Sequence, residues 1–383
     1  MRSLYSLTSL FLIGTLLLAA SCTSNQESQP ENTATEVDLS LQEELRIASG
    51  DGTDESAPLL GGIANVATGP EGDIYLYDSD NGRIFVYGPD GSYLRAFGRS
   101  GEGPGEFGSI SDMVVDRQNR VIVSDFGNAR FSLFDEEGDL IKREPLHGLR
   151  SARDMTELPD GRFAVTGWHA DSERTVHILS PDLSRIETSL VALDSLVQSE
   201  DNRIVNTYQS FPGQLQVLED GRLAFVPTFY DGELRIYEEG DDGTWSLSER
   251  LEGYRRVEEA LLVTEQNYNS PSEAMEELSP NSILSIAIRQ GGSTTLVHAR
   301  TRSQGLFRDG GGGLLHVLRY FEGTEHQVVV ERFDPGSGLT SYGTILEGRE
   351  GSINVNGMTQ NGQLYLSNPD SLTLQRVQIL GFD

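Results

Sequence analysis

The feature that most constrains the fold of this sequence is a repeat with a period of 47 residues. Segment 72–78 (Gly-Asp-Ile-Tyr-Leu-Tyr-Asp) aligns at this offset with segment 119–125 (Asn-Arg-Val-Ile-Val-Ser-Asp). The same offset superimposes Asp78, Asn81, Arg83, Tyr87 and Gly91 on Asp125, Asn128, Arg130, Phe134 and Gly138. Self-similarity at such a fixed period indicates an architecture built from repeated supersecondary units.

Each unit contains short runs of β-branched and aromatic residues that are separated by turn signals. In the first unit these runs are 74–77, 83–87 and 93–97, and Gly-Pro-Asp-Gly at 88–91 is a turn sequence. Short apolar runs bounded by such turns are typical of antiparallel strands. The repeat unit is therefore predicted to be a four-stranded antiparallel meander.

Four weaker copies of the turn-then-strand signal follow, at 159–163, 219–223, 309–315 and 360–364, which makes six units. The last unit has only three evident strands, and the alternating stretch from Val37 to Ile47 can supply its missing outer strand. Closing a ring of four-stranded sheets leaves few exposed strand edges. The sequence therefore predicts an all-β fold, a six-bladed β-propeller closed by an N-terminal strand.

The units resemble NHL repeats, whose consensus combines a Gly-Asn-Ile-Tyr-Val-x-Asp strand with Asn-x-Arg-Ile and a Phe-Asp-x-x-Gly turn. Segment 97–107 (Phe-Gly-Arg-Ser-Gly-Glu-Gly-Pro-Gly-Glu-Phe) is similar to the inter-blade connection of six-bladed propeller lipoproteins of Bacteroidetes-type bacteria. The resemblance is strong over residues 61–142, and in later units Gly167 and Pro227 replace the strand-ending Asp. It implies a propeller fold and a cell-envelope address rather than an activity.

The N-terminus predicts secretion and lipid anchoring. An apolar run over 4–20 follows Arg2 and ends in small residues directly before Cys22, the only cysteine. This layout is that of a signal peptide over 1–21, and it resembles the lipobox of bacterial lipoproteins, in which the cysteine is lipidated. Segment 22–36 is polar and suits a flexible tether, and the propeller is expected over 37–383. An uncleaved helix and ordinary cleavage that leaves a free thiol are the alternatives.

Thr23 follows the anchor where an aspartate would retain a lipoprotein in the inner membrane, so by that resemblance the outer membrane is expected. Which side of the outer membrane the domain faces cannot be read from the sequence.

The formal net charge of −30 excludes one class of partner. Lys142 is the only lysine and arginine supplies the other permanent positive charges, and because binding to phosphates needs clustered bases, no nucleic-acid partner is expected for so acidic a chain. An acidic surface solvated in a salty medium explains the charge, and an acidic face that recruits cations or basic partners is the alternative. No Asp-x-Asp-x-Asp-Gly calcium loop is present to favour that alternative.

One segment, about 254–300, breaks the period and is predicted to be a partly helical insertion. Ser270-Pro271-Ser272-Glu273 has the residues of a helix start, and a second helical pattern runs from Arg256 to Val263. Insertions on repeat scaffolds often carry binding elements, so a lid or a partner-binding role is one interpretation. A passive cover over a strand edge, or an incomplete extra blade, is the other.

Recognisable catalytic motifs are absent from the sequence. The six histidines show no metal-ligand spacing, and no Gly-x-Ser-x-Gly elbow occurs. Trp168 and His169 follow an apolar strand at an expected loop and are candidate ligand contacts, or else a blade-interface tryptophan beside a solvated histidine. The repeated Asp, Asn and Arg sets are interpreted as turn-stabilising residues, and the glycines of 101–105 as a blade connection.

Polar residues at the start of each innermost strand are better candidates, because those strand ends ring the central channel. By position they are Asp112, Arg153, Asp154, Gln209, Gln304 and Asn356. Convergent polar groups in a pocket are the usual basis for a binding-site hypothesis. Asp112, Asp154 and Asn356 would be a minimal oxygen ligand set, which favours calcium over zinc if a metal is bound.

Three functions from different classes follow. The first is a lipid-anchored binding or scaffolding module for a protein, peptide or glycan, without nucleic acid as a partner. The second is a calcium-dependent enzyme similar to the lactonase and lyase propellers, in which the metal would act as a Lewis acid. The third is a sensor or structural subunit of an envelope complex, which would use the 254–300 insertion as its contact surface. A fold shared by so many activities does not choose among them.

Overall fold

The computed structural model describes most of the chain after the N-terminal region. The described residues are 34–50, 58–150, 152–255, 257, 260–263, 268, 270, 273, 284–290, 293–322, 325–347, 354–359, 362–368 and 372–382. The segments predicted as signal peptide and most of the tether, with Cys22, lie outside them. No helix in these ranges combines the length and apolar composition needed to cross a lipid bilayer.

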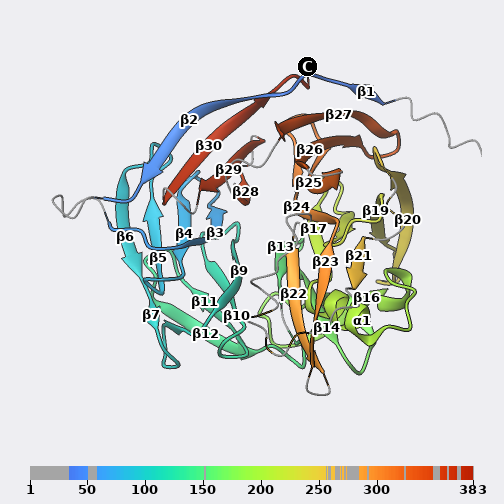
Figure 1. The fold of residues 1–383 in the computed structure, drawn as a ribbon. Coiled ribbons are helices and arrows are strands. Elements are labelled where there is room, and N and C mark those ends of the chain that lie inside the picture. Colours follow the sequence, from blue (N-terminus) through green and yellow to red (C-terminus); the bar gives the residue numbers. More distant parts are fainter. Residues whose placement is uncertain are drawn as a thin grey trace, which may run out of the picture. The chain divides into compact units, whose positions relative to one another are not determined.

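Six antiparallel sheets in the described residues form the blades of a propeller (Figure 1). Blade 1 contains β3 (Ile63–Thr68), β4 (Ile74–Asp78), β5 (Arg83–Tyr87) and β6 (Tyr93–Phe97). Blade 2 contains β9 (Ile110–Val115), β10 (Val121–Asp125), β11 (Arg130–Phe134) and β12 (Leu140–Pro145). Blade 3 contains β13 (Asp154–Glu157), β14 (Phe163–His169), β15 (Arg174–Leu179) and β16 (Ile186–Ala192).

The other three blades follow the same order, with the first strand of each innermost. Blade 4 contains β17 (Gly213–Val217), β18 (Leu223–Pro227), β19 (Glu233–Glu239) and β20 (Trp245–Glu252). Blade 5 contains β24 (Thr301–Arg308), β25 (Leu314–Glu322), β26 (Glu325–Asp334) and β27 (Gly338–Glu347). Blade 6 contains β28 (Asn354–Met358), β29 (Gln363–Asn368) and β30 (Thr373–Leu380).

The N-terminal segment completes blade 6 and extends blade 5. The alternation from Val37 to Ile47 predicted the strand of blade 6. Strand β2 (Ser40–Ala48) pairs antiparallel with β30 and is the outer strand of blade 6. Just before it, β1 (Thr35–Glu36) adds a parallel fifth strand to β27 of blade 5. The six-bladed fold and its closure by an N-terminal strand are therefore confirmed.

The core is divided among the junctions between neighbouring blades. Six apolar clusters occupy the six junctions, from blades 1 and 2 around to blades 6 and 1. Second strands such as β4, β10 and β18 bury every residue, because both faces of the sheet meet a neighbouring blade. The outer strand β12 alternates between half-buried and exposed residues. Continuous apolar runs in the repeats are thus explained by burial on two sides.

The insertion is built mainly of strands where it is described, which corrects part of the prediction. Strands β21 (Leu261–Val263), β22 (Leu284–Gln290) and β23 (Ser293–Ala299) form a separate three-stranded sheet. Residues 261–263, at the end of the helix expected from Arg256 to Val263, form a strand instead, and Leu261 packs into the core between blades 3 and 4. Glu273 is helical and its N–H donates to Ser270 Oγ (3.1 Å), as the capping pattern predicted. The rest of that segment lies outside the described residues.

A short helix lies elsewhere, in the connection between blades 3 and 4. Helix α1 (Asn202–Ser210) follows the 3-10 turn η1 (Leu193–Ser195), and its N-cap Asp201 accepts a hydrogen bond from the N–H of Arg203 (2.9 Å). Tyr208 is buried, and Ile204 and Val205 pack against the same core cluster. The sequence prediction missed this helix, since it occupies only nine residues.

Candidate functional site

The repeated Asp and Asn side chains stabilise the fold, as the sequence prediction proposed. In blade 2, the buried Asp125 carboxylate accepts hydrogen bonds from the N–H groups of Gly108 (3.1 Å) and Ser109 (2.9 Å). Asn128 Nδ2 donates to the same carboxylate (2.6 Å) and to the carbonyl oxygen of Gly101 (2.9 Å). Asp78 and Asn81 make the equivalent bonds in blade 1. These sets hold each incoming connection against its blade and leave no ligand site.

The glycine-rich connection between blades 1 and 2 is also occupied by its own residues. It contains the short parallel strands β7 (Arg99–Ser100) and β8 (Glu106–Phe107). The Glu106 carboxylate accepts from the N–H of Gly103 (2.7 Å), and Arg130 donates to the carbonyl oxygens of Gly103 and Glu106. Since a carboxylate of the chain already fills this loop, an anion site there is not supported.

The innermost strands surround the central channel in the order β3, β9, β13, β17, β24 and β28, and β28 contacts β3 again. Asp112 lies on β9, Asp154 begins β13, Gln304 lies on β24 and Asn356 on β28. Arg153 directly precedes β13, and its N–H donates to the carbonyl oxygen of Thr166 (3.0 Å). These five predicted residues are therefore located at inner strands.

Gln209 does not lie on an inner strand. It is on helix α1, and the inner strand of blade 4 begins at Gly213, so Gln214 takes the position that was assigned to Gln209. Gln214 pairs with Val226 as Asp112 pairs with Ser124 and Asp154 with Thr166. The turn-like Pro212-Gly213 ahead of the alternating Gln-Leu-Gln-Val could have identified this residue from the sequence.

Asp112 and Asp154 form a carboxyl pair at the inner strands of blades 2 and 3. Burial and the nearby charge of Asp154 hold the pKa of Asp112 well above its usual range. Burial raises the pKa of Asp154 to about 7, although its carboxylate accepts a hydrogen bond from the Leu215 N–H (2.5 Å), which favours ionisation. Near neutral pH the pair therefore carries fewer than two negative charges.

The three-residue calcium site expected from the sequence, which adds Asn356 to this pair, remains a prediction. No hydrogen bond joins Asn356 to either carboxyl, and β28 is not adjacent to β9 or β13 in the ring. In the described ranges, no group of three or more His, Cys, Asp and Glu side chains converges in a way that could hold a metal ion. Calcium prefers six to eight oxygen ligands, so a calcium ion at these residues would need further oxygen ligands.

Three side-chain amides on consecutive inner strands have buried oxygens without a partner. Gln214 Oε1, Gln304 Oε1 and Asn356 Oδ1 accept no hydrogen bond from the described residues. Gln304 and Asn356 are each the extra residue of a β-bulge, since β24 and β28 shift register at them. Bulges re-aim side chains and are frequent beside functional sites. Most buried polar groups in proteins have a hydrogen-bond partner, so three unpaired amide oxygens on adjacent strands need an explanation.

Three arginines lie at the end of the channel where the inner strands begin. Arg302 is the second residue of β24 and pairs across the sheet with Arg319 on β25, and Arg153 precedes β13. The guanidinium of Arg153 stacks on the ring of Phe211 (4.5 Å to the centroid). Burial lowers the pKa of all three arginines, and the charge of Arg302 lowers those of Arg153 and Arg319 further. Sequence analysis missed Arg302 and Arg319, because the insertion hides where blade 5 begins.

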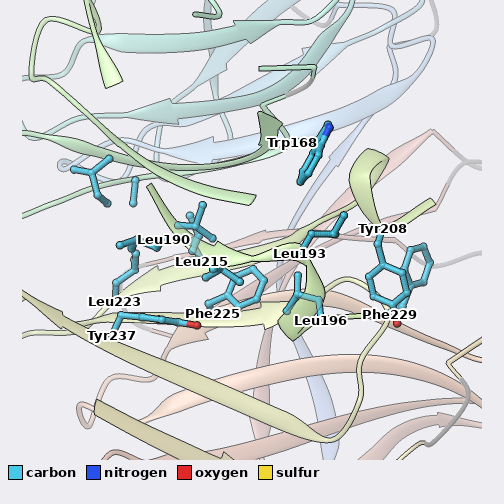
Figure 2. Packing of buried hydrophobic residues seen from close by; sticks show 14 of the residues in the cluster. Trp168, Leu190, Leu193, Leu196, Tyr208, Leu215, Leu223, Phe225, Phe229 and Tyr237 are labelled. Carbon is cyan, nitrogen blue, oxygen red and sulfur yellow. The ribbon is translucent and has the colours of Figure 1, made fainter. Parts of the chain in front are cut away.

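Trp168 and His169 lie away from the channel. Trp168 is 8% exposed and packs in the core between blades 3 and 4 (Figure 2). His169 is half-buried, its Nδ1 accepts from the Ser172 N–H (3.3 Å), and its ring faces that of His177 (5.8 Å). The structure thus makes Trp168 a core residue of the blade junction and gives His169 a local turn contact.

Blade 5 contains a buried hydrogen-bonded chain that links a hydroxyl, an imidazole and a carboxylate. Ser303 Oγ bonds to His316 Nε2, and His316 Nδ1 lies 2.8 Å from Glu331 Oε2. Glu331 also accepts from the N–H of Tyr254 (2.5 Å). Ser303 is 2% exposed, and His316 and Glu331 are 0% exposed. The order resembles a nucleophile, base and acid, but the near-complete burial of all three side chains is what a network that stabilises the fold requires.

A cavity of about 450 Å³ lies at the other end of the blades, between the first turns of blades 3 and 4. Arg162 on its wall bonds to Glu239 (Nη1 to Oε1, 2.9 Å) and Asp160 (Nε to Oδ2, 2.6 Å). Arg222 pairs in the same way with Asp220 and Glu249. Because its arginines already have carboxylate partners, this cavity has less unmet bonding capacity than the channel entrance.

The strand order and the ring of inner strands define a six-bladed β-propeller. Residues 53–173 match the family model DUF5128, which is described as a 6-bladed beta-propeller. The chain is also 36% identical over 69 residues to NHL repeat-containing protein 3 from Homo sapiens, a match that spans 17% of this chain and 20% of that protein. The expected NHL-type resemblance is therefore supported over a short part of the chain.

Two solved structures are similar over most of the chain. A member of the DUF4221 family from Bacteroides vulgatus has a TM-score of 0.55 at 11% identity, and the match covers 90% of this chain and 99% of that one. A protein described as exported, from Bacteroides fragilis, has a TM-score of 0.52 at 12% identity, covering 88% and 95%. At such identities the likeness shows the fold alone.

Proposed function

We propose that this protein is a lipid-anchored binding module of the bacterial cell envelope, which holds a peptide, a glycan or a protein segment at the entrance of its channel. The observation that supports this most directly is the set of three amide oxygens without partners: Gln214, Gln304 and Asn356. A buried acceptor left unpaired costs about 1–3 kcal/mol. A ligand that brings N–H or O–H donors to the channel would remove that cost.

The other groups at the inner strands also suit binding. The carboxyl pair Asp112 and Asp154 can accept hydrogen bonds from a ligand. The guanidinium groups of Arg153, Arg302 and Arg319 can donate hydrogen bonds and carry positive charge. Among the described residues, the hydrogen bond between Ser303 and His316 is fully buried. Recognition by several directional groups therefore accounts for the arrangement without a reaction step.

A triple variant tests the role of the amides. Gln214→Met, Gln304→Met and Asn356→Leu keep the shapes of the side chains and remove the three acceptors. On peptide and envelope-glycan arrays, we expect the full chain to retain a ligand that the variant binds at least about tenfold more weakly, since each hydrogen bond contributes about 0.5–1.5 kcal/mol. The unfolding temperature should stay equal or rise, because unpaired buried acceptors are removed.

A matched variant, Gln118→Met with Gln198→Met, changes amides that are exposed. It should alter neither binding nor unfolding. If the channel variant instead unfolds at a clearly lower temperature while ligand binding persists, the amides serve the fold and the proposal is wrong.

The lipid anchor rests on the sequence layout before Cys22 and on the polar tether that follows it. We expect metabolic labelling with a palmitate analogue to mark the wild-type protein and not Cys22→Ser. Wild type should fractionate with outer membranes, and the variant should be recovered in the soluble fraction, because a diacylated cysteine supplies most of the membrane affinity. Equal labelling or equal fractionation of the two proteins would remove the anchor from the proposal.

A further inference from the structure

The cavity between blades 3 and 4 has features of a ligand site that the proposed function does not use. It lies at the end of the blades opposite the channel entrance, and its volume of about 450 Å³ is within the range of small-molecule sites in proteins. The charged part of its lining consists of Asp160, Arg162, Asp220, Arg222, Glu238 and Glu239.

Two equivalent turns in consecutive blades supply four of these charged groups. In blade 3, the Asp160 carboxylate accepts hydrogen bonds from the backbone N–H of Arg162 (3.0 Å) and from its Nε (2.6 Å). In blade 4, the Asp220 carboxylate accepts the same two bonds from Arg222, at 3.1 and 2.7 Å. The repeated Asp-Gly-Arg sequence therefore gives the cavity a fixed carboxylate and a fixed guanidinium from each blade.

The ion pairs of the lining keep hydrogen-bonding capacity. Arg162 Nη1 donates to Glu239 Oε1 (2.9 Å), and Nη2 donates to the other oxygen of the same carboxylate. A guanidinium has five N–H donors and a carboxylate has about four lone-pair positions, so such pairs leave unused donors beside unused acceptors. A ligand that both donates and accepts can therefore bond to the pairs without separating them.

The charges of the lining favour a neutral ligand. Four carboxylates and two guanidinium groups line the cavity, so an anion would be repelled. A cation would compete with Arg162 and Arg222 for carboxylates that already accept charge-assisted hydrogen bonds. Only Glu238, which is exposed, forms no ion pair in the part of the chain that the structure describes.

Trp245 adds an aromatic surface to these polar groups. It lies on β20 directly opposite Glu239 on β19, so the two side chains leave the same face of blade 4. Trp245 also packs against the core cluster between blades 3 and 4, which fixes its ring. Its Nε1 is buried and donates to no described residue, although a buried indole N–H usually has a partner.

We propose that this cavity binds a neutral sugar unit. The hydroxyl groups of a sugar both donate and accept hydrogen bonds, which matches the ion pairs of the lining. The C–H groups on the flat side of a sugar ring carry partial positive charge and can pack on the negative face of the indole of Trp245. The inference goes beyond the proposed function, because none of the lining residues belongs to the inner strands of the channel.

The experiment is a titration of the full chain with glucose, galactose, mannose and N-acetylglucosamine, followed by calorimetry and tryptophan fluorescence. Glucosamine and glucuronate are the cationic and anionic comparisons. At least one neutral sugar should bind saturably, and glucuronate should bind at least about tenfold more weakly than that sugar. If no neutral sugar binds, or if glucosamine binds more tightly than every neutral sugar, the proposal is overturned.

Two variants connect the binding to the cavity. Trp245→Leu should weaken binding of the neutral sugar at least about tenfold and abolish the fluorescence change, because the chain's other tryptophan, Trp168, is a core residue. Leu247→Ala is the matched control, since Leu247 lies on the same strand, is 38% exposed and is outside the lining. Glu238→Gln should narrow the difference between glucuronate and the neutral sugar at least about threefold, because it removes a negative charge without a change in the core.

Thermal unfolding without sugar separates a lost site from a lost fold. If Trp245→Leu unfolds at a clearly lower temperature than wild type, Glu238→Gln decides, and an unchanged preference in that variant would contradict the site. Equal losses in Trp245→Leu and Leu247→Ala would also contradict it. The amide triple variant should bind the neutral sugar as wild type does. A loss of binding there would assign the sugar to the channel, which would overturn the cavity site and leave the proposed function standing.

Discussion

Glu331→Ala is expected to lose at least about 3 kcal/mol of unfolding free energy. Glu331 is fully buried, and its carboxylate accepts hydrogen bonds from His316 Nδ1 (2.8 Å) and the Tyr254 N–H (2.5 Å). Removing the carboxylate takes away the acceptor of a fully buried imidazole and of a backbone N–H, which is costly because a buried polar group without a partner is desolvated. Denaturant unfolding followed by circular dichroism measures the difference.

An exposed pair provides the control for this prediction. Glu43 and Arg46 interact at 2.5 Å, but their side chains are 38% and 51% exposed. Glu43→Ala should therefore change the unfolding free energy by less than about 1 kcal/mol. A similar small effect for Glu331→Ala would show that the chain Ser303, His316 and Glu331 is not a stabilising network, and its resemblance to a catalytic arrangement would need another explanation.

A loss of stability as the pH rises from about 4 to about 7 is expected from Asp154. Burial raises the pKa of its carboxyl to about 7 from the usual 3.8, so over this range the folded protein holds a proton that the unfolded chain has released. The stabilisation is complete below the unfolded-state pKa and is lost as the pH passes the folded-state value. At 1.36 kcal/mol per pKa unit, the effect is at most about 4 kcal/mol.

Asp154→Asn isolates this contribution from the general repulsion of a chain with net charge −30. Asparagine keeps an acceptor for the Leu215 N–H and does not ionise. The variant should match wild type near pH 4 and exceed it by about 2–4 kcal/mol at pH 8, when unfolding is measured in denaturant with a chelator present. The pKa of Asp112 should fall in the variant, because the neighbouring charge is gone. A pH-independent difference between the two proteins would contradict the raised pKa.

The fold could be predicted because each blade is marked by strand and turn residues that lie close together in the sequence. Turn residues such as Asp90 and Gly91 end a strand without any information from distant residues, and the strand runs are buried on both faces. The strand nature of Leu261–Val263 could not be found in this way. Its apolar residues are compatible with a helix or a strand, and its pairing with β23 is decided by a tertiary contact.

The candidate site was predictable only in part. Asp112 stands at the start of a blade with a clear repeat, and Asp154 lies just before the turn signal at 159–161 of the next unit, so counting from the turns placed both on inner strands. Gln209 was misplaced because an unforeseen helix shifted the start of blade 4. Arg319 lies on a second strand and joins the site only through its register with Arg302, a relation that sequence spacing does not contain.

The way the N-terminal strands close the ring also fixes when the protein can finish folding. Gln375 on β30 contacts Glu43 on β2, a pair separated by 332 positions. The N-terminal strand β2 therefore cannot pair until the C-terminal strand β30 has been synthesised. Until β30 has emerged, β2 has no partner and blade 6 has no complete sheet. Closure of the ring is therefore a late, long-range folding step. A chain that stops before Thr373 leaves the edges of β2 and β29 unpaired, and another molecule can pair with them.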